Sequence, residues 1–288
     1  MTLLLPDWSR PHDRGSGRRR LPGIRRTALI DSVENLAIVW ASIDRLCSDL
    51  PAGQWDLLTG CPGWTVKDQL SHLVDYEARA LGRPAPRHEP GPLPHVKNEM
   101  GRVNEVGVDA RRAMPGPAVL DEFRQVTAER LAQLRRLAPG DLAAQTATPA
   151  GPGTVADLLT LRVMDSWSHE QDIRRAVGRP GHTEGPAVEE AVAYFSRFLP
   201  YLVGKRAAAP DGTKVVFRIG ARPPVAVEVA GGRGRLAADP GDATVDLAVP
   251  VTTFAALVGG RADVPAGTVI SGDQRLGRRV LESMAFLP

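Results

Sequence analysis

The sequence has little cysteine, few aromatic residues and no long apolar run. Two cysteines in 288 residues are too few for a disulfide framework, and Cys47 falls in a helical apolar pattern that predicts a buried thiol. No stretch approaches the ~18 apolar residues of a membrane span. The N-terminal segment also lacks the apolar region of a secretory signal. We therefore expect a cytoplasmic protein without a membrane partner.

The remaining composition is that of a folded globular chain. Hydrophobic residues make up 43% of the sequence and charged residues 24%, whereas aromatic residues make up only 5%. The net charge is +3, but seven arginines lie within residues 1–26, and the rest of the chain is near neutral. Residues 1–26 thus predict a flexible basic arm with weak, salt-dependent affinity for phosphates or anionic lipid. Because no nucleic-acid-binding motif follows, nucleic acid is not the expected partner.

Apolar residues at three- and four-residue steps predict four main helices between residues 27 and 182. The second begins at Thr65, where Thr-Val-Lys-Asp forms a capping box, and runs to about residue 81. A loop rich in Pro and Gly and a weaker helical stretch over 96–114 precede the third helix, which starts near Pro117. Four helices with one apolar face each pack most simply as an up-and-down bundle.

After the fourth predicted helix, the sequence pattern changes from helical periodicity to alternation of polar and apolar residues. Thr154 and Asp157 form another capping box, and Gly178 with Pro180 supplies a stop signal. A helix from Ala187 then leads into alternating segments that predict strands, with helical patterns around them; the strands are expected at 215–219, 225–229 and 244–249, and the helices at 251–258 and 273–284. Residues 187–288 therefore predict a small α+β domain after the bundle.

Three side chains of the predicted bundle can converge on one ion. His72 lies on the flank of the second helix beside Gln69 and Tyr76, where it can point into the bundle. Asp165 and His169 are four residues apart on the fourth helix, so both side chains leave the same face. Bundles build metal sites from such a pair and a ligand of a facing helix, and three protein ligands leave a position open for substrate. We interpret these three residues as the ligands of a divalent metal ion.

The same residues have other interpretations. Arg162, Asp165, His169 and Asp172 form one polar stripe on an otherwise apolar helix, so they line a wet cavity or pair with one another. A His and an Asp at this spacing are also typical of a solvated pair or a hydrogen bond, and Arg162 with Asp172 of an intrahelical ion pair. Trp64 is typical of a hydrophobic staple before the helix cap, with a stacking platform as the alternative.

Two segments resemble a known family. They are Cys-Pro-Gly-Trp-Thr-Val-Lys-Asp at 61–68, with Ser-His-Leu at 71–73, and Arg-Val-Met-Asp-Ser-Trp-Ser-His-Glu-Gln-Asp-Ile-Arg-Arg-Ala at 162–176. Together they resemble the mycothiol-dependent maleylpyruvate isomerase family over residues 30–285. The resemblance implies an N-terminal DinB-like four-helix bundle with a metal site and a C-terminal sterol-carrier-like α+β domain, whose closing turn and helix resemble residues 270–277.

The resemblance also implies the cofactors. The metal ligands of the family fall on His72, Asp165 and His169; members typically use zinc, and mycothiol serves as the thiol cosubstrate. The acidic ligand of the family is often Glu. The shorter Asp165 is expected to change the affinity for the metal rather than to prevent metal binding. A metal with an open position lowers the pKa of a bound thiol, so neither Cys47 nor Cys61 is needed as nucleophile.

Further residues are candidates for binding and catalysis. Arg162 and Asp172 are the expected catalytic residues, and the expected thiol contacts are Arg162, Asp172, Arg175 and Arg222. Arg218 and Arg275 are further candidates for holding carboxylates, because guanidinium forks suit them, although solvated surface arginines are the more ordinary interpretation. The structure expected from the sequence places substrate entry between the two domains.

The predicted activity is addition of the thiol to an electrophilic small molecule, as an S-transferase or as a maleylpyruvate-type cis–trans isomerase. No sequence feature decides between these outcomes, because a fold does not fix a substrate. Two other classes stay open: a non-catalytic module that binds a ligand or a partner, and a stress-response regulator whose basic arm contacts nucleic acid. The sequence also leaves open whether the chain forms a homodimer.

Overall fold

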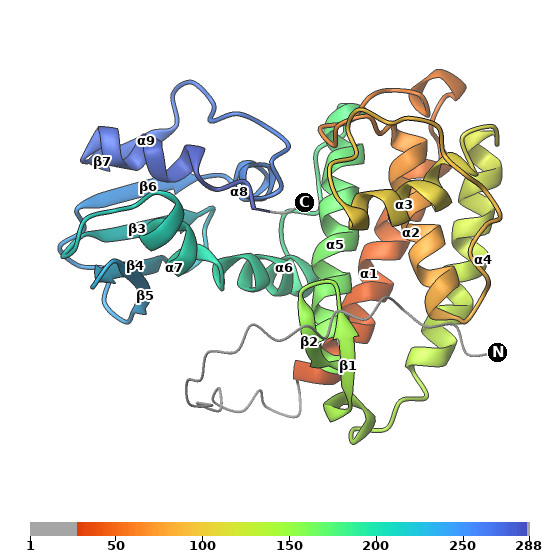
Figure 1. Cartoon of the computed structure of the whole chain (residues 1–288), viewed down its shortest axis with the longest axis horizontal. Helices are drawn as coiled ribbons and strands as arrows, with labels where there is room; N and C mark the ends of the chain where they lie inside the picture. Colours follow the sequence, from red (N-terminus) through yellow and green to blue (C-terminus); the bar gives the residue numbers. More distant parts are fainter. Residues whose placement is uncertain (1–27, 287–288) are drawn as a thin grey trace.

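The structure, a computed structural model, describes residues 28–286 and begins with a helical part (Figure 1). The basic arm predicted at residues 1–26 lies outside the described residues. The helices of this part are α1 (Ala28–Ser48), α2 (Val66–Ala80), α3 (Glu99–Asp109), α4 (Gly116–Leu134) and α5 (Val155–Ala176). Within residues 28–286, no helix has the length and hydrophobicity needed to cross a membrane.

The two helices that carry the predicted ligands begin at capping boxes. The Thr65 hydroxyl accepts the backbone N–H of Asp68, and the Asp68 carboxylate accepts the N–H of Thr65. Thr154 and Asp157 make the same reciprocal pair at the start of α5. Each box satisfies two N–H groups that a helix start leaves without partners, and so fixes where the helix begins. Both predicted boxes are confirmed.

Four long helices form the bundle, each packed against two neighbours in the cyclic order α1–α4–α2–α5. Side-chain bonds from Gln69 to His169 and from Arg162 to Glu77 show that α2 and α5 are antiparallel. Bonds from Trp40 to Ser166 and from Ser42 to Glu170 show that α1 and α5 run in the same direction. The predicted bundle is confirmed, while its helices do not simply alternate along the chain, because the long connection containing α3 lets α4 run parallel to α2.

The C-terminal part is built on a five-stranded sheet in the order β5–β4–β3–β6–β7. Its strands are β3 (Lys214–Ile219), β4 (Val225–Ala230), β5 (Arg233–Ala237), β6 (Val245–Val249) and β7 (Val269–Gly272). β3 and β6 are parallel neighbours, and the other pairs are antiparallel. The helices of this part are α6 (Pro186–Ser196), a short α7 (Leu199–Tyr201) continued by a π-helical turn (Leu202–Arg206), α8 (Val251–Val258) and α9 (Gln274–Glu282). The predicted α+β region is confirmed.

Several short elements are not predicted by the sequence pattern. Edge strands β5 and β7 flank the sheet, and a hairpin of β1 (Gln145–Thr148) and β2 (Gly151–Thr154) precedes α5. Short 3-10 turns lie at Ala52–Gln54 and Asp141–Ala143. Helix α3 is shorter than the predicted stretch over 96–114.

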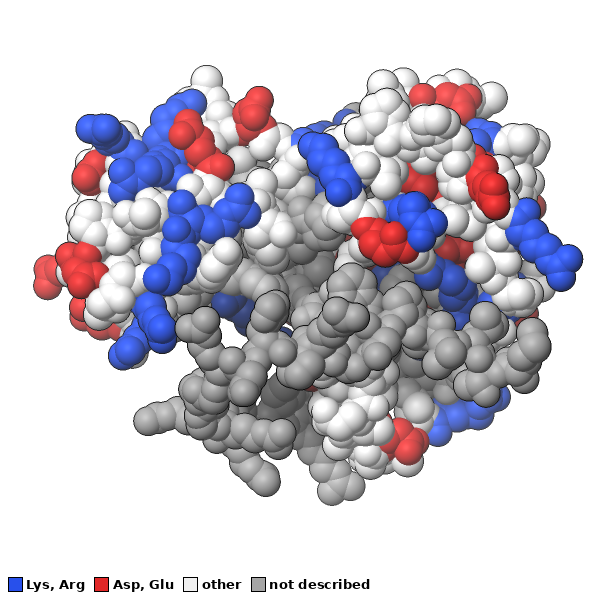
Figure 2. All heavy atoms as spheres, viewed as in Figure 1, with Lys and Arg blue, Asp and Glu red and all other residues white. Residues whose placement is uncertain are grey.

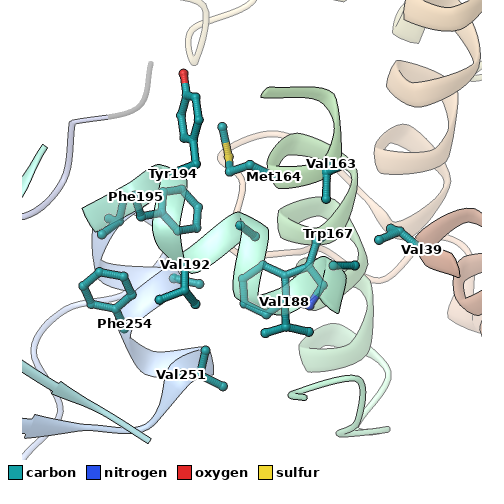
Figure 3. Close-up of a cluster of buried hydrophobic side chains, with 14 of the residues drawn as sticks. Val39, Val163, Met164, Trp167, Val188, Val192, Tyr194, Phe195, Val251 and Phe254 are labelled. Atoms are coloured by element: carbon teal, nitrogen blue, oxygen red, sulfur yellow. The ribbon is translucent and has the colours of Figure 1, made fainter. Parts of the chain in front are cut away.

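Helix α6 lies between the bundle and the sheet (Figure 1), and it packs against α5 and α1 of the bundle and against α8 of the C-terminal part. Figure 3 shows its side chains Val188, Val192 and Phe195 between Trp167 of α5 and Phe254 of α8. Trp167 is fully buried, and its indole N–H donates to the carbonyl of His182 at 2.9 Å. The apolar core therefore continues from the bundle through α6 into the sheet. The bundle boundary proposed at 182 lies before this shared helix, and the start of the second domain proposed at 187 falls on its second residue.

Figure 2 shows the charge distribution on one face of the molecule. Basic side chains follow one another across the α+β part, whereas on the bundle acidic and basic side chains are interspersed. An indentation separates the two parts on this face.

We predict that Trp167→Ala lowers the free energy of unfolding by roughly 3–5 kcal/mol, because it removes a large side chain from the centre of the shared core. Urea denaturation followed by circular dichroism measures the change. Tyr201→Ala is the matched control, since Tyr201 is 56% exposed and its loss is expected to change stability by less than about 0.5 kcal/mol. Equal effects of the two substitutions would contradict the central place of Trp167.

Candidate metal centre

The structure brings together the three predicted ligands, His72 on α2 and Asp165 and His169 on α5. One nitrogen of each imidazole and one carboxylate oxygen all lie within 4.8 Å of one another. The Nε2 atom of His72 is 3.5 Å from Oδ2 of Asp165, and the Nε2 atom of His169 is 3.5 Å from Oδ1 of the same carboxylate. The centroids of the two imidazole rings are 4.7 Å apart. Both imidazoles are buried, whereas the Asp165 side chain is 24% exposed. The cluster is thus enclosed on the side of the imidazoles and reachable on the side of the carboxylate.

These separations suit a shared ion better than direct hydrogen bonds. A nitrogen and an oxygen hydrogen-bonded to each other lie at about 2.7–3.2 Å. Two ligand atoms that each bind one zinc ion tetrahedrally at about 2.1 Å lie about 3.4 Å apart. The donor set of two imidazoles and one carboxylate is of the kind that zinc accepts, and it leaves a fourth position open. The residues present therefore fit a divalent metal.

The orientation of His169 is fixed by a neighbour on α2. Its Nδ1 atom contacts the side-chain oxygen of Gln69, and the Gln69 amide nitrogen donates to the Thr59 hydroxyl at 2.6 Å. An Nδ1–H that donates to Gln69 leaves the lone pair of Nε2 directed at Asp165, which is how partners of metal-binding histidines select the tautomer. Burial lowers the pKa of His72, and Asp165 only partly offsets this, so the neutral imidazole that binds metals is favoured.

Trp64 lies against both imidazoles. Its ring centroid is 5.2 Å from that of His72 and 5.9 Å from that of His169. Its indole N–H donates to the carboxylate of Glu105 at 2.5 Å, and the same carboxylate contacts His95 at 2.6 Å. Trp64 precedes the cap of α2 as a staple residue does, and it also forms one wall of the candidate metal centre.

Arg162 lies beside the cluster and is almost fully buried. Its Nε donates to Glu77 at 2.8 Å and its Nη1 to Asp165 at 2.5 Å, and the guanidinium lies 3.6 Å from the Tyr76 ring centroid. Burial raises the pKa of Asp165, but the Arg162 charge and the two imidazoles outweigh it and hold this pKa well below its usual range. Arg162 therefore keeps Asp165 ionised.

Asp172, the other expected catalytic residue, pairs with different partners. The intrahelical pair with Arg162 is not formed. The buried Asp172 carboxylate instead accepts Nη1 of Arg175 at 3.2 Å and Nε of Arg261 at 3.1 Å. Arg175 is 38% exposed, which leaves part of its guanidinium available to a ligand.

Arg261 is a residue that sequence reasoning did not find. It follows α8 in the C-terminal part, and its Nη1 also donates to the carbonyl of Gly259 at 2.7 Å. Its backbone carbonyl packs against Gly60 so closely that a Cβ at Gly60 would lie 2.9 Å from it. Arg261 thus brings the C-terminal part into contact with α5 and with the loop before α2. No spacing or motif signals this, because the contact joins segments about 90 and 200 residues apart in the sequence.

The other candidate arginines lie away from the cluster. Arg222 pairs with Glu189 and donates to the carbonyl of Thr183 at 3.0 Å. It lines a cavity of about 600 Å³ whose other lining residues include Glu184, Glu189 and Thr252 but none of the three candidate ligands. Arg218 pairs with Asp246 on the sheet. Arg275 is exposed at the start of α9.

We predict that Glu77→Gln lowers the free energy of unfolding by roughly 3–5 kcal/mol, because it removes a buried carboxylate that accepts bonds from both Arg162 and Arg130. Urea denaturation measures the change. Glu129→Gln is the matched control, because Glu129 is 48% exposed in its ion pair with Arg83. Loss of such an exposed pair is expected to lower the free energy of unfolding by about 0–1 kcal/mol. If both variants behave alike, Glu77 does not hold the buried charges together.

Comparison with solved structures shows a shared fold. The chain is similar to the crystal structure of the mycothiol-dependent maleylpyruvate isomerase, with a TM-score of 0.55, 16% identity and coverage of 84% of this chain and 92% of that one. A histidine-to-alanine mutant of the same enzyme gives a TM-score of 0.52 at 15% identity, with the same coverage. At these identities the comparison concerns the fold alone.

Sequence comparisons identify the family. Two uncharacterised proteins from two strains of Mycobacterium tuberculosis are each 29% identical over 140 residues, which is 47% of this chain and 52% of theirs. The chain thus spans about half the length of the curated relatives it matches. Residues 36–174 match the mycothiol maleylpyruvate isomerase N-terminal domain, and residues 189–279 match the C-terminal domain of the same enzymes. Since these two matches take in most of the sequence in order, the chain belongs to the mycothiol-dependent maleylpyruvate isomerase family.

Proposed function

We propose that this chain is a metal-dependent enzyme that activates a low-molecular-weight thiol, mycothiol, for addition to an electrophilic small molecule. The observation that carries the proposal is the separation of 3.5 Å between Asp165 and each of the two imidazoles, on facing helices and with one open side. Membership of the family supports mycothiol as the thiol and a maleylpyruvate-type cis–trans isomerisation as the reaction. An S-transferase is the alternative outcome at the same site.

His72, Asp165 and His169 would hold the metal, and zinc suits their two nitrogens and one oxygen. When bound, the metal supplies an electrophile that lowers the pKa of a thiol and makes a thiolate available at neutral pH. Gln69 orients His169, and Arg162 keeps Asp165 negatively charged. Trp64 covers the imidazoles and excludes water from that side.

The cysteines of the chain are poor nucleophiles, which supports an external thiol. Burial raises the pKa of Cys47 to about 12 and that of Cys61 to about 11. Cys61 lies near Arg261 and Gln69, yet at neutral pH it stays a thiol. A thiolate is the reactive form in addition to a carbon electrophile. The nucleophile is therefore better supplied by a cosubstrate.

We assign Arg261 the role of anchoring a carboxylate of the substrate or of the thiol. Asp172 and the Gly259 carbonyl hold its Nε and Nη1, which leaves the Nη2 edge of the guanidinium to a ligand. Guanidinium groups bind carboxylates with two parallel hydrogen bonds. For isomerisation, the thiolate adds to the activated double bond, the new single bond rotates, and elimination of the thiolate restores the double bond. A transferase stops at the adduct.

The non-catalytic alternative expects a large apolar cavity in the α+β part. The cavity beside Arg222 is lined by charged and polar side chains as well as by Pro250 and Val251. That lining does not favour an apolar ligand.

We predict that His169→Ala loses bound zinc and reduces mycothiol-dependent turnover at least a hundredfold, because it removes one of three metal ligands. Metal analysis of the purified protein and a mycothiol-dependent assay with maleylpyruvate and other electrophiles measure the two effects. His88→Ala is the matched control, since His88 pairs with Asp109 on α3, away from the cluster. Full zinc retention in His169→Ala would refute the assignment.

We predict that Arg261→Met lowers kcat/KM at least tenfold while zinc content stays unchanged, because a carboxylate contact is lost and the metal ligands are not. Arg261→Lys restores the charge without the fork and is expected to recover only part of the activity. Arg218→Met is the control, because Arg218 pairs with Asp246 on the exposed sheet. Unchanged kcat/KM in a folded Arg261→Met protein would remove Arg261 from the site.

A further inference from the structure

A second cavity, of about 500 Å³, lies between α1 and the end of α5. Its lining residues are Ile38, Ser42, Arg45, Leu46, Arg174, Arg179 and His182. None of them is a candidate metal ligand, and none is a residue assigned to the proposed reaction. The cavity faces α1, whereas the metal cluster faces α2. It is therefore a separate site.

One wall of the cavity is a closed network around a buried carboxylate. Glu170 is fully buried and accepts bonds from Ser42 at 2.7 Å and Arg174 at 2.8 Å, and it contacts His182 at 2.6 Å. His182 has φ of 50°, in the left-handed region, and its carbonyl is held by the side chains of Trp167 and Gln171. Such a strained residue persists only where the surrounding contacts determine it. The wall is thus preorganised.

Two arginines of the cavity are left over from this network. The ion pairs at the cavity join Arg174 and His182 to Glu170, and neither Arg45 nor Arg179 pairs with a carboxylate of residues 28–286. Arg179 makes one long contact, 3.5 Å to the carbonyl of Asp49. Two guanidinium groups that have no carboxylate partner in the described part of the chain therefore border the same space.

The charge balance favours an anion. Helices α1 and α5 both end here, and each helix C-terminus carries about half a negative charge. The two helix ends together offset about one of the three positive charges of Arg45, Arg174 and Arg179, and the Glu170 carboxylate offsets a second. One full positive charge is left facing the cavity.

Apolar side chains of α1 also line the cavity. Ile38, which is 41% exposed, and Leu46 lie on the same helix as Arg45. An exposed isoleucine beside arginines suits a ligand that carries a short hydrocarbon part next to its charged group.

We propose that this cavity binds a small organic oxyanion, a carboxylate or a phosphate ester, with Arg45 and Arg179 contacting the charged group and Ile38 and Leu46 contacting the hydrocarbon part. The guanidinium fork matches both kinds of oxyanion. The proposal does not depend on the metal site or on the proposed reaction.

Calorimetric titration of the full chain with benzoate, phenyl phosphate and inorganic phosphate at constant ionic strength tests the proposal. Benzoate or phenyl phosphate is expected to bind saturably with Kd below about 10 mM, and more tightly than inorganic phosphate. Whichever of the two binds more tightly identifies the headgroup. The double variant Arg45→Gln, Arg179→Gln is expected to bind it at least tenfold more weakly. Arg174 and His182 are left in place because they hold Glu170.

Two further variants test whether binding is specific to this cavity. Arg136→Gln with Arg235→Gln changes the net charge equally at two exposed positions and is expected to leave the affinity unchanged. His169→Ala is also expected to leave it unchanged, because His169 belongs to the metal cluster. Absence of saturable binding below about 10 mM, equal affinity in the wild type and the Arg45, Arg179 double variant, or loss of binding in His169→Ala would each overturn the proposal.

Discussion

The candidate metal centre depends on one buried interaction, in which the Arg162 guanidinium lies between the carboxylates of Glu77 and Asp165. Glu77 also accepts a bond from Arg130, so the same charges connect α2, α4 and α5. An uncompensated buried charge costs several kcal/mol, and only one register of these helices satisfies all of the charges at once. That register is the one that places His72 opposite His169.

An acidic residue of the polar stripe on α5 also forms an ion pair with a residue outside the bundle. Asp165 pairs with Arg162 of its own helix, whereas Asp172 pairs both with Arg175 of α5 and with Arg261 of the C-terminal part. The α+β part therefore completes the charge balance of α5. Together, Arg175 and Arg261 explain how Asp172 can be buried on α5 without a partner on α1 or α2.

The local signals of the sequence predicted more than its long-range ones. Capping boxes at Thr65 and Thr154 and the four-residue spacing of Asp165 and His169 are properties of single helices, so periodicity and caps suffice to predict them. The contact of Arg261 with Asp172 joins two parts of the fold, so no repeating pattern in the sequence predicts it. Strands β5 and β7 escape prediction because they are edge strands with largely exposed side chains, which weakens the alternation of polar and apolar residues.

Helix α6 offers apolar side chains to both of its neighbours, and Trp167 is buried beneath it (Figure 3). If the chain were cut before α6, the isolated bundle would expose Trp167 to water. If it were cut after α6, the isolated C-terminal part would expose Phe254, because Phe195 of α6 packs against it. The two halves of this chain are consequently not interchangeable modules: a recombinant that grafts either half onto a foreign partner has to carry α6 with it and supply a matching surface for its other side.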